Sequence, residues 1–143
     1  SGMIYGIGCD LCGVERMEKS LAGPHGAAFA RRVFGPAERD TLGLPLTGEE
    51  PARGWAHRAA SAAADFAAKE AFLKAAGTGL REPFSLCEIE AVRLPSGAPA
   101  YRFTGRTAEW VEQRGLQARL SLSHDGGMAL AFCVLEQADR PET

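Results

Sequence analysis

The sequence predicts an α+β domain in which an antiparallel sheet packs around one long helix. The first observation is an alanine-dense segment, Trp55–Ala76, in which ten of the eighteen residues from 59 to 76 are alanine, the residue with the highest helix propensity. The second is a strand-like N-terminal segment that contains two glycines. The third is a group of four short strand patterns after the long helix. Because these strands are grouped rather than alternating with helices, the order favours α+β over a parallel α/β fold.

Length and composition indicate one globular domain, which we place at residues 3–137. The chain has 143 residues, 45% of them hydrophobic and 24% charged. A net charge of −2 without a basic patch argues against nucleic-acid binding. The sequence shows neither a membrane span nor a signal peptide, so we expect a cytoplasmic protein without a membrane partner. Residues 1–2 resemble an expression remnant, and residues 138–143 are expected to fray.

The first predicted strand, Ile4–Cys12, has two unlike faces. One face carries larger side chains, whereas Gly6, Gly8 and Asp10 lie on the other. Two glycines leave room for another backbone or a ligand to approach closely. Asp10 has two interpretations from the residues alone, a cap for the helix that begins near Val14 or a functional carboxylate.

The other elements follow from turn residues and periodicity. Between the first strand and the long helix we expect a loop at Leu21–Gly26, a helix at Ala27–Val33, a helical turn opened by Pro36, and a loop at Leu42–Gly54. After the long helix we expect strands at Phe84–Arg93, Ala100–Thr104, Gln117–His124 and Met128–Glu136, the last buried on both faces, with a helix at Thr107–Arg114.

Glu70 is the residue of the long helix that needs an explanation. Its helical neighbours on the same face are apolar: Ala59, Ala63, Phe66 and Leu73. An unpaired charge in an apolar stripe is strongly disfavoured. The residues alone allow a surface ion pair with Lys74 or a metal-binding or catalytic carboxylate. Gly77 ends the helix.

Four cysteines occur, at positions 9, 12, 87 and 133. Cys9-x-x-Cys12 lacks a second cysteine pair or a spaced histidine pair to complete a zinc site. On a strand, residues three apart also point to opposite faces. We therefore interpret the cysteines as structural thiols of a reducing compartment.

Three motifs carry a resemblance to a known family. They are GIGCD at 6–10, FAAKEAFLKAAGTG at 66–79 and SLSHD at 121–125, supported by FARRVFGPAE at 29–38 and the Gly97-x-Pro99 turn. In this order and at this spacing, the chain resembles the holo-acyl-carrier-protein synthases, the small-type 4′-phosphopantetheinyl transferases. The resemblance covers nearly the whole chain.

The resemblance implies a reaction and the residues that carry it. The family transfers the phosphopantetheine arm of coenzyme A, the substrate, to a serine of an apo acyl carrier protein and releases adenosine 3′,5′-bisphosphate. It implies that Asp10 and Glu70 hold Mg²⁺, or Mn²⁺, that Glu70 takes the serine proton directly or through a water, and that Lys74 assists the departing phosphate. Asp10, Glu70 and Lys74 are thus the catalytic candidates.

The resemblance also implies binding residues and an assembly. Coenzyme A is expected to contact Arg58, Lys74, Gly77, Thr78, Ser96, Gly97, Pro99, Ser123 and His124. The segment from Ser96 to Pro99 would reach the coenzyme of a neighbouring subunit, because the family is typically a homotrimer with sites at its subunit contacts. Arg16 would dock the acidic carrier protein; the residue alone is equally typical of a solvated helix surface.

Two positions depart from the family pattern. Asp65 stands ahead of Phe66, where many relatives carry an arginine, and Ala98 stands where a basic residue is common. An acid at this position would repel the coenzyme. We therefore expect Lys69, four residues on, to form an ion pair with Asp65, and we expect Arg58 to supply the missing positive charge. These departures bear on coenzyme affinity more than on reaction type.

Other functions remain to be weighed. A non-catalytic relative that binds carrier protein or coenzyme A would fit Asp65, and a metal-dependent pyrophosphate hydrolase would use water in place of serine. A serine hydrolase is disfavoured, because there is no Gly-x-Ser-x-Gly motif and Ser123 and His124 point apart on a strand. Taken alone, His124 would be interpreted as a polar residue that ends a strand with its hydrogen bonds satisfied. Glycines around Thr78 are also explained by a plain helix stop.

Overall fold

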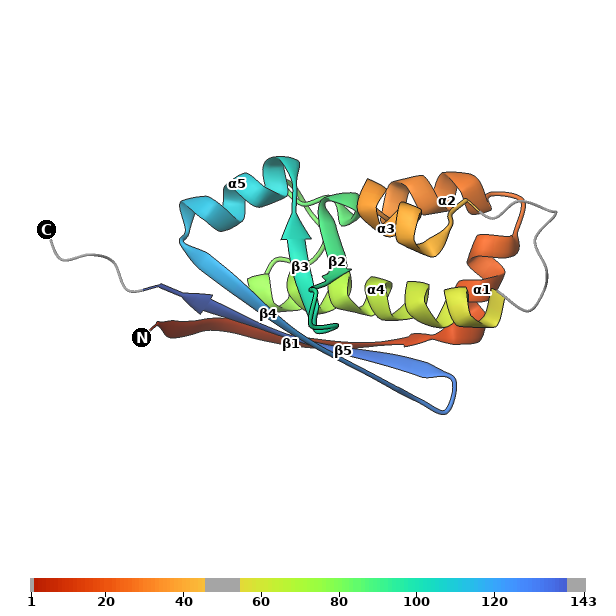
Figure 1. Ribbon diagram of the computed structural model, residues 1–143. Coiled ribbons are helices and arrows are strands. Elements are labelled where there is room, and N and C mark those ends of the chain that lie inside the picture. Colours follow the sequence, from red (N-terminus) through yellow and green to blue (C-terminus); the bar gives the residue numbers. More distant parts are fainter. Residues whose placement is uncertain (1, 46–54, 139–143) are drawn as a thin grey trace, which may run out of the picture.

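The computed structural model of the protein describes residues 2–45 and 55–138 (Figure 1). Its helices are α1 (Val14–Ala22), α2 (Gly26–Val33), α3 (Pro36–Leu42), α4 (Trp55–Ala76) and α5 (Gly105–Gln113), with a 3₁₀ turn, η2, at Leu86–Glu88. Its strands are β1 (Met3–Gly13), β2 (Ile89–Arg93), β3 (Pro99–Phe103), β4 (Leu116–Asp125) and β5 (Met128–Gln137). The loop predicted for Leu42–Gly54 and the predicted tail lie largely outside the described residues.

Two antiparallel sheets replace the single sheet that the sequence predicted. The first has three strands in the order β1-β5-β4, and the second is the β2–β3 hairpin. In Figure 1 the three-stranded sheet lies on one side of α4, whereas the hairpin, α2, α3 and α5 lie on the other. α4 therefore contacts both layers, and its buried residues belong to the two hydrophobic clusters of the described chain.

β1 approaches α4 so closely that only glycine fits at two positions. A Cβ at Gly6 would lie 1.9 Å from the carbonyl oxygen of Ala75, and one at Gly8 would lie 2.1 Å from that of Ala71. The helix backbone thus fills the bare strand face that the sequence predicted. Because side chains alternate along a strand, Asp10 continues this face and points to the same side as α4.

The helix-cap interpretation of Asp10 is wrong. The N-cap of α1 is Gly13, and no side chain caps this helix end. Asp10 lies four residues before Val14, within β1, where it pairs with Ala131 of β5. A cap has to reach the first free N–H groups of the helix, and the strand continues too far for Asp10 to do so.

Two further strand predictions need correction. The segment predicted as strand Phe84–Arg93 begins with the turn η2, and β2 starts only at Ile89. β5 is not buried on both faces, because burial alternates along it. Ala131 and Cys133 are buried against α4, whereas Leu130 and Phe132 face outward. The apolar sequence of β5 does not distinguish a covered outer face from an exposed one.

An apolar surface results on the side of the three-stranded sheet that faces away from α4. Ile7 and Leu11 of β1 are 58% exposed, Leu130 is 37% exposed and Phe132 is 40% exposed. We refer to these four residues as the outer sheet face. Side chains of this size gathered on one exposed surface mark a contact region.

The remaining sequence inferences on thiols and membranes can be compared with the described residues. The four cysteines are free thiols, with Cys133 buried and Cys9 exposed. Among the described helices, none combines the length and apolar character required to cross a bilayer. Within residues 2–45 and 55–138, no group of three or more cysteine, histidine or acidic residues forms a metal cluster.

The close contact between β1 and α4 makes a stability prediction. Gly8→Ala forces a methyl group into the Ala71 carbonyl and should lower the free energy of unfolding by about 3 kcal/mol or more. Gly13→Ala is the matched control, because its nearest neighbours would lie 3.8 Å away, and it should cost less than about 1 kcal/mol. Urea unfolding of both variants measures the difference. Equal stabilities would contradict the proposed role of the contact.

Candidate active site

The structure brings Asp10 of β1 and Glu70 of α4 together. The glycine contact holds α4 against β1, so that their carboxylates interact. Partial burial raises the pKa of Glu70, the negative charge of Asp10 raises it further, and Lys74 opposes both effects. Two like charges held in one place favour a proton or a cation between them.

Lys74 completes this cluster from the same helix. Its Nζ lies 3.1 Å from Oδ1 of Asp10 and donates a hydrogen bond of 2.8 Å to the carbonyl oxygen of Cys9. β1 is an edge strand, so the Cys9 carbonyl is open to this contact. The ion pair of Lys74 is thus with Asp10, and the surface Glu70–Lys74 pair is not formed. Because the Lys74 side chain is 56% exposed, the pair positions the ammonium group and adds little stability.

The end of α4 forms the helix stop that the sequence predicted. Gly77 has a φ of +83° and donates to the carbonyl oxygens of Leu73 and Lys74. The hydroxyl of Thr78 donates to the carbonyl oxygen of Gly79 over 3.2 Å. These bonds account for the glycines structurally, and the predicted coenzyme contacts of Gly77 and Thr78 stay a prediction.

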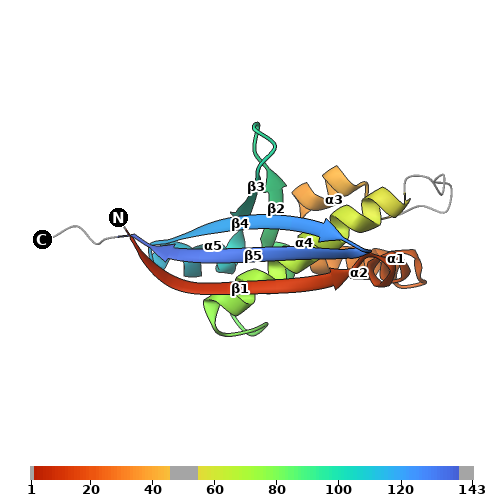
Figure 2. The same ribbon diagram turned by 90° about the horizontal axis from the view of Figure 1, so that it is seen from below.

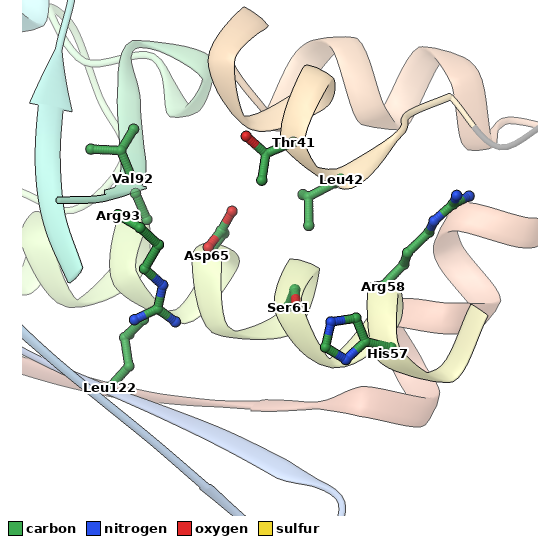
Figure 3. Close-up of a pocket in the computed structure, with 10 residues that line it drawn as sticks. Thr41, Leu42, His57, Arg58, Ser61, Asp65, Val92, Arg93 and Leu122 are labelled. Carbon is green, nitrogen blue, oxygen red and sulfur yellow. The ribbon is translucent and has the colours of Figure 1, made fainter. Parts of the chain in front are cut away.

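A second candidate region is a cavity of about 500 Å³ between α3, α4 and β2 (Figure 3). Its polar lining consists of Thr41, His57, Arg58, Ser61, Asp65 and Arg93. Leu122 of β4 closes one side. In Figure 3 Asp65 points from α4 toward Thr41 and Leu42 of α3, and Arg93 approaches from β2. Guanidinium groups and hydroxyls around a cavity of this size are typical of a site for a phosphate-bearing ligand.

The predicted ion pair between Asp65 and Lys69 is wrong. Lys69 is fully buried and forms its ion pair with Glu38 of α3, with further hydrogen bonds to the carbonyl oxygens of Leu86 and Ile89. Lys69 has an interior acceptor that the helix pattern could not reveal, because Glu38 is distant in sequence. The i,i+4 spacing describes exposed helix surfaces, whereas this lysine points into the core.

Asp65 consequently has an unusual charge environment. Burial raises the pKa of Asp65 to about 8, with the neighbouring carboxylate of Glu38 as the next cause and Lys69 acting against both. Burial also raises the pKa of Glu38 and lowers that of Lys69, and the charge of each partner opposes these shifts. Burial and Glu38 therefore both favour the neutral form of the acid in the cavity.

The other predicted coenzyme residues lie at the opposite edge of the sheet. Leu122 faces the cavity, and His124 follows it on the same face of β4 at the exposed strand end. Ser123 is exposed on the outer face, so the structure separates it from His124. Ser96, Gly97 and Pro99 belong to the β2–β3 hairpin, whose tip projects beyond β4, away from β1 (Figure 2).

Arg16 lies on the exposed side of α1 and lines a second cavity. This cavity measures about 430 Å³ and is otherwise largely apolar, with Met17, Phe29, Phe66 and Met128 in its wall. An exposed arginine beside an apolar hollow has the composition of a protein contact region.

Sequence reasoning missed three parts of this region. Arg93 and His57 line the cavity, and Glu38 holds the buried lysine. Arg93 directly precedes a Leu-Pro turn, and Glu38 follows the Gly-Pro helix start, so both stand beside recognisable signals. Their mutual contacts depend on how α3 packs on α4 and β2, which no local pattern contains.

The fold and this cluster define a class of protein that handles phosphate groups: acids suited to a divalent cation, a lysine beside them and an arginine-lined cavity. A family model described as the 4′-phosphopantetheinyl transferase superfamily matches residues 6–133. The chain belongs to this superfamily, as its three motifs predicted.

Individual relatives are similar over nearly their whole length. The holo-[acyl-carrier-protein] synthase of Ralstonia nicotianae is 40% identical over 136 residues, which cover 95% of this chain and 94% of that relative. The crystal structure of the synthase from Neisseria meningitidis is 35% identical with a TM-score of 0.71, covering 94% of this chain and all of the other. The synthase from Bacillus anthracis in complex with CoA (3′,5′-ADP) is 31% identical with a TM-score of 0.70, covering 95% and 99%.

The buried pair of Glu38 and Lys69 makes a second stability prediction. Lys69→Met leaves the Glu38 carboxylate buried without its cation and should cost about 3 kcal/mol or more, and adding Glu38→Gln should recover part of this loss. Lys19→Met is the control, since the Lys19–Glu15 pair is exposed and contributes about 0.5 kcal/mol or less. Guanidinium unfolding compares the variants. A loss at Lys69 no larger than at Lys19 would refute the interpretation.

Proposed function

We propose that the protein transfers the 4′-phosphopantetheine arm of coenzyme A to a serine of an apo acyl carrier protein. The carrier serine oxygen bonds to the phosphorus that bears the pantetheine, and the bond from this phosphorus to its bridging oxygen breaks. Adenosine 3′,5′-bisphosphate leaves with that oxygen. The observation that carries the proposal is the cluster of Asp10, Glu70 and Lys74 at the β1 edge, in a chain of this superfamily. A similar synthase structure contains CoA, which supports the choice of donor.

Asp10 and Glu70 fit a divalent cation such as Mg²⁺ or Mn²⁺. Asp10 raises the pKa of Glu70, so a cation between the two would relieve a repulsion that the fold imposes. Carboxylate oxygens are ligands that Mg²⁺ prefers, and it usually retains waters and substrate phosphate oxygens beside one or two carboxylates. Bound there, the ion would neutralise the charge that builds on the pyrophosphate during transfer.

Glu70 and Lys74 carry the proton chemistry in this proposal. Glu70 is half-buried and its pKa is raised, which makes it a stronger base than an exposed glutamate, and it takes the proton of the attacking serine directly or through one water. Lys74 is positioned by Asp10 and the Cys9 carbonyl, and its ammonium group donates to the departing phosphate oxygen.

The working form in this proposal is a homotrimer in which each site combines two subunits. Asp10, Glu70 and Lys74 lie at the β1 edge, whereas the cavity and the β2–β3 hairpin lie at the β4 edge of the same sheet. If the β1 edge of one subunit met the β4 edge of the next, the two groups of residues would form one site. The outer sheet face supports such an assembly, because it exposes large apolar side chains on the edge strand β1 and on the central strand β5.

Coenzyme binding is divided between the two edges in the same way. Gly77 and Thr78 end α4 on the side of Lys74, and they would contact the coenzyme from one subunit. Arg58 and His124, together with Ser96, Gly97 and Pro99, would contact it from the neighbour. Ser123 faces outward, so its contact with the coenzyme would also depend on the subunit interface.

In this proposal the carrier protein docks at the second cavity, the one that Arg16 lines. An acyl carrier protein is acidic, and Arg16 beside an apolar hollow offers both charge and apolar contact. The four free thiols fit a cytoplasmic protein, where disulfides are rare. A binding relative without transferase activity is the alternative, and Asp65 in the arginine-lined cavity is the observation that favours it.

The activity test uses mass spectrometry of the carrier. The protein mixed with coenzyme A, Mg²⁺ and an apo carrier should add the mass of the phosphopantetheine arm, and Glu70→Gln should reduce the rate by about 10³-fold or more, because it removes the base and a metal ligand. Glu109→Gln, in an exposed position of α5, should retain full activity.

Each outcome of this test separates the candidate functions. Coenzyme binding by calorimetry without a mass shift, tried with several carriers, would support the binding relative. Release of free phosphopantetheine without carrier modification would support a pyrophosphate hydrolase. Full turnover by Glu70→Gln would remove Glu70 from the mechanism.

The assembly test places a charge on the outer sheet face. Phe132→Glu should convert a trimer into monomers and lower transfer activity, because an interfacial carboxylate cannot be desolvated without a partner. Glu109→Gln serves again as a control that stays trimeric. Sedimentation equilibrium gives the mass of each species. A monomeric wild-type protein with full activity would contradict the shared site.

A further inference from the structure

Asp65 presents an electrostatic problem for a phosphate-binding cavity. Its side chain lines the cavity together with Arg58, Arg93 and His57, at a position where an ionised carboxylate would repel an anion. The inference below rests on the proposed function, since it takes the cavity as the site for a phosphate group of the coenzyme. It concerns how this chain accommodates the acid.

Glu38, the neighbour of Asp65, is stabilised as a carboxylate. Its Oε1 accepts from the backbone N–H of Gly35 at 3.0 Å and from Lys69, and its Oε2 accepts from the N–H of Ala91 at 3.0 Å. Burial raises the pKa of Glu38, and these three donors, one of them charged, act against that shift by stabilising the ionised form. When two acids share one proton, the carboxylate that accepts more hydrogen bonds keeps its charge more readily and the other takes the proton.

Lys69 and Arg102 form their ion pairs with acids other than Asp65. Lys69 donates to Glu38 and to the carbonyl oxygens of Leu86 and Ile89, which accounts for its three protons. Arg102 lies 3.9 Å from Glu90, the third acid of this region. Oε2 of Glu90 accepts from two N–H groups at the start of α3, at 2.8 and 3.1 Å. Among the described groups, Lys69 and then Arg93 act against the raised pKa of Asp65, and burial and Glu38 outweigh them.

We propose that Asp65 stands in the cavity as a neutral carboxylic acid that donates its proton to Glu38, and that phosphate binding in the cavity is lost when this proton leaves in mild alkali. The neutral acid adds no negative charge to the cavity. An aspartate thereby occupies a position in a phosphate site without cancelling its attraction for anions.

The pKa of Asp65 is consistent with this arrangement. Burial and Glu38 together raise it to about 8, so the neutral form predominates at pH 7 and the charged form near pH 9. The groups that act on it come from each element packed against it: Glu38 from α3, Lys69 from α4 and Arg93 from β2. Glu90 acts on Lys69 and so indirectly on the same pair.

The test compares the wild-type protein with Asp65→Asn. Asparagine has the same shape, its amide can donate to Glu38 in place of the acid proton, and it cannot ionise. The probe is adenosine 3′,5′-bisphosphate, whose phosphates lose their last protons near pH 6, so that its charge is almost constant above about pH 7.5. Titration calorimetry between about pH 7.5 and about pH 9.5 measures the dissociation constant.

The wild-type protein should lose roughly tenfold or more in affinity across this range, because a full negative charge appears beside the bound phosphate. Asp65→Asn should vary by less than about twofold over the same range and match the wild-type affinity at pH 7.5. His57→Gln should retain the wild-type pH dependence, which separates Asp65 from the imidazole in the same cavity.

Stability gives a second readout that needs no ligand. The pKa of Asp65 in the folded state lies above its ordinary value of 3.8, so the folded state binds the proton more tightly and loses stability as pH rises between the two values. Asp65→Asn should therefore raise the Tm at pH 9 more than at pH 5. Both effects follow from the same ionisation.

The proposal is overturned if the wild-type affinity is constant with pH, if Asp65→Asn shows the same fall, or if the bisphosphate does not bind at pH 7.5. These outcomes are distinct from failure of the proposed function, which the carrier mass shift measures. A chain that binds the bisphosphate with the predicted pH dependence but transfers nothing would support the inference and contradict the transferase activity.

Discussion

The contact between the backbones of β1 and α4 is the constraint on which the candidate site depends. Gly6 and Gly8 let the helix approach until a methyl group would overlap its carbonyl oxygens. With the helix held this close, partial burial and then the charge of Asp10, on a different element, raise the pKa of Glu70. A strand with larger residues would hold the helix farther away. The glycines therefore contribute to chemistry through distance, without touching a ligand.

α4 serves two sites because its sides carry different residues. One side presents Glu70 and Lys74 to β1, and another presents Asp65 to the cavity beside α3 and β2. Lys69 lies between these positions in sequence and points into the core, where Glu38 fixes α3 against the helix. The pair is costly to bury, and such pairs are weak evidence for net stability. Here its position sets the wall of the cavity and the charge beside Asp65.

Sequence reasoning succeeded where the determinants are local. Alanine content and a terminal glycine predicted both ends of α4, and two glycines predicted a close approach on one face of β1. It failed where the partner is distant in sequence. Lys69 pairs with Glu38, thirty-one residues away, although an acid at Asp65 has the helical spacing for a pair. The apolar pattern of β5 likewise did not reveal that its outer side is exposed in the chain. Packing between elements decides both cases.

Asp65 stands where an arginine is expected, and the charges of the neighbouring residues explain how an acid can occupy this position. Beside Asp65 lie Glu38, already stabilised by three donors, and Lys69, already committed to it. Adding an ionised acid would place a net negative charge in a half-buried region, whereas a protonated acid adds none. Arg93 of β2, on a different element from the position of the lost arginine, is a cation that lines the cavity. Positive charge in the cavity can thus move between elements while the ligand site is retained, provided that the acid keeps its proton.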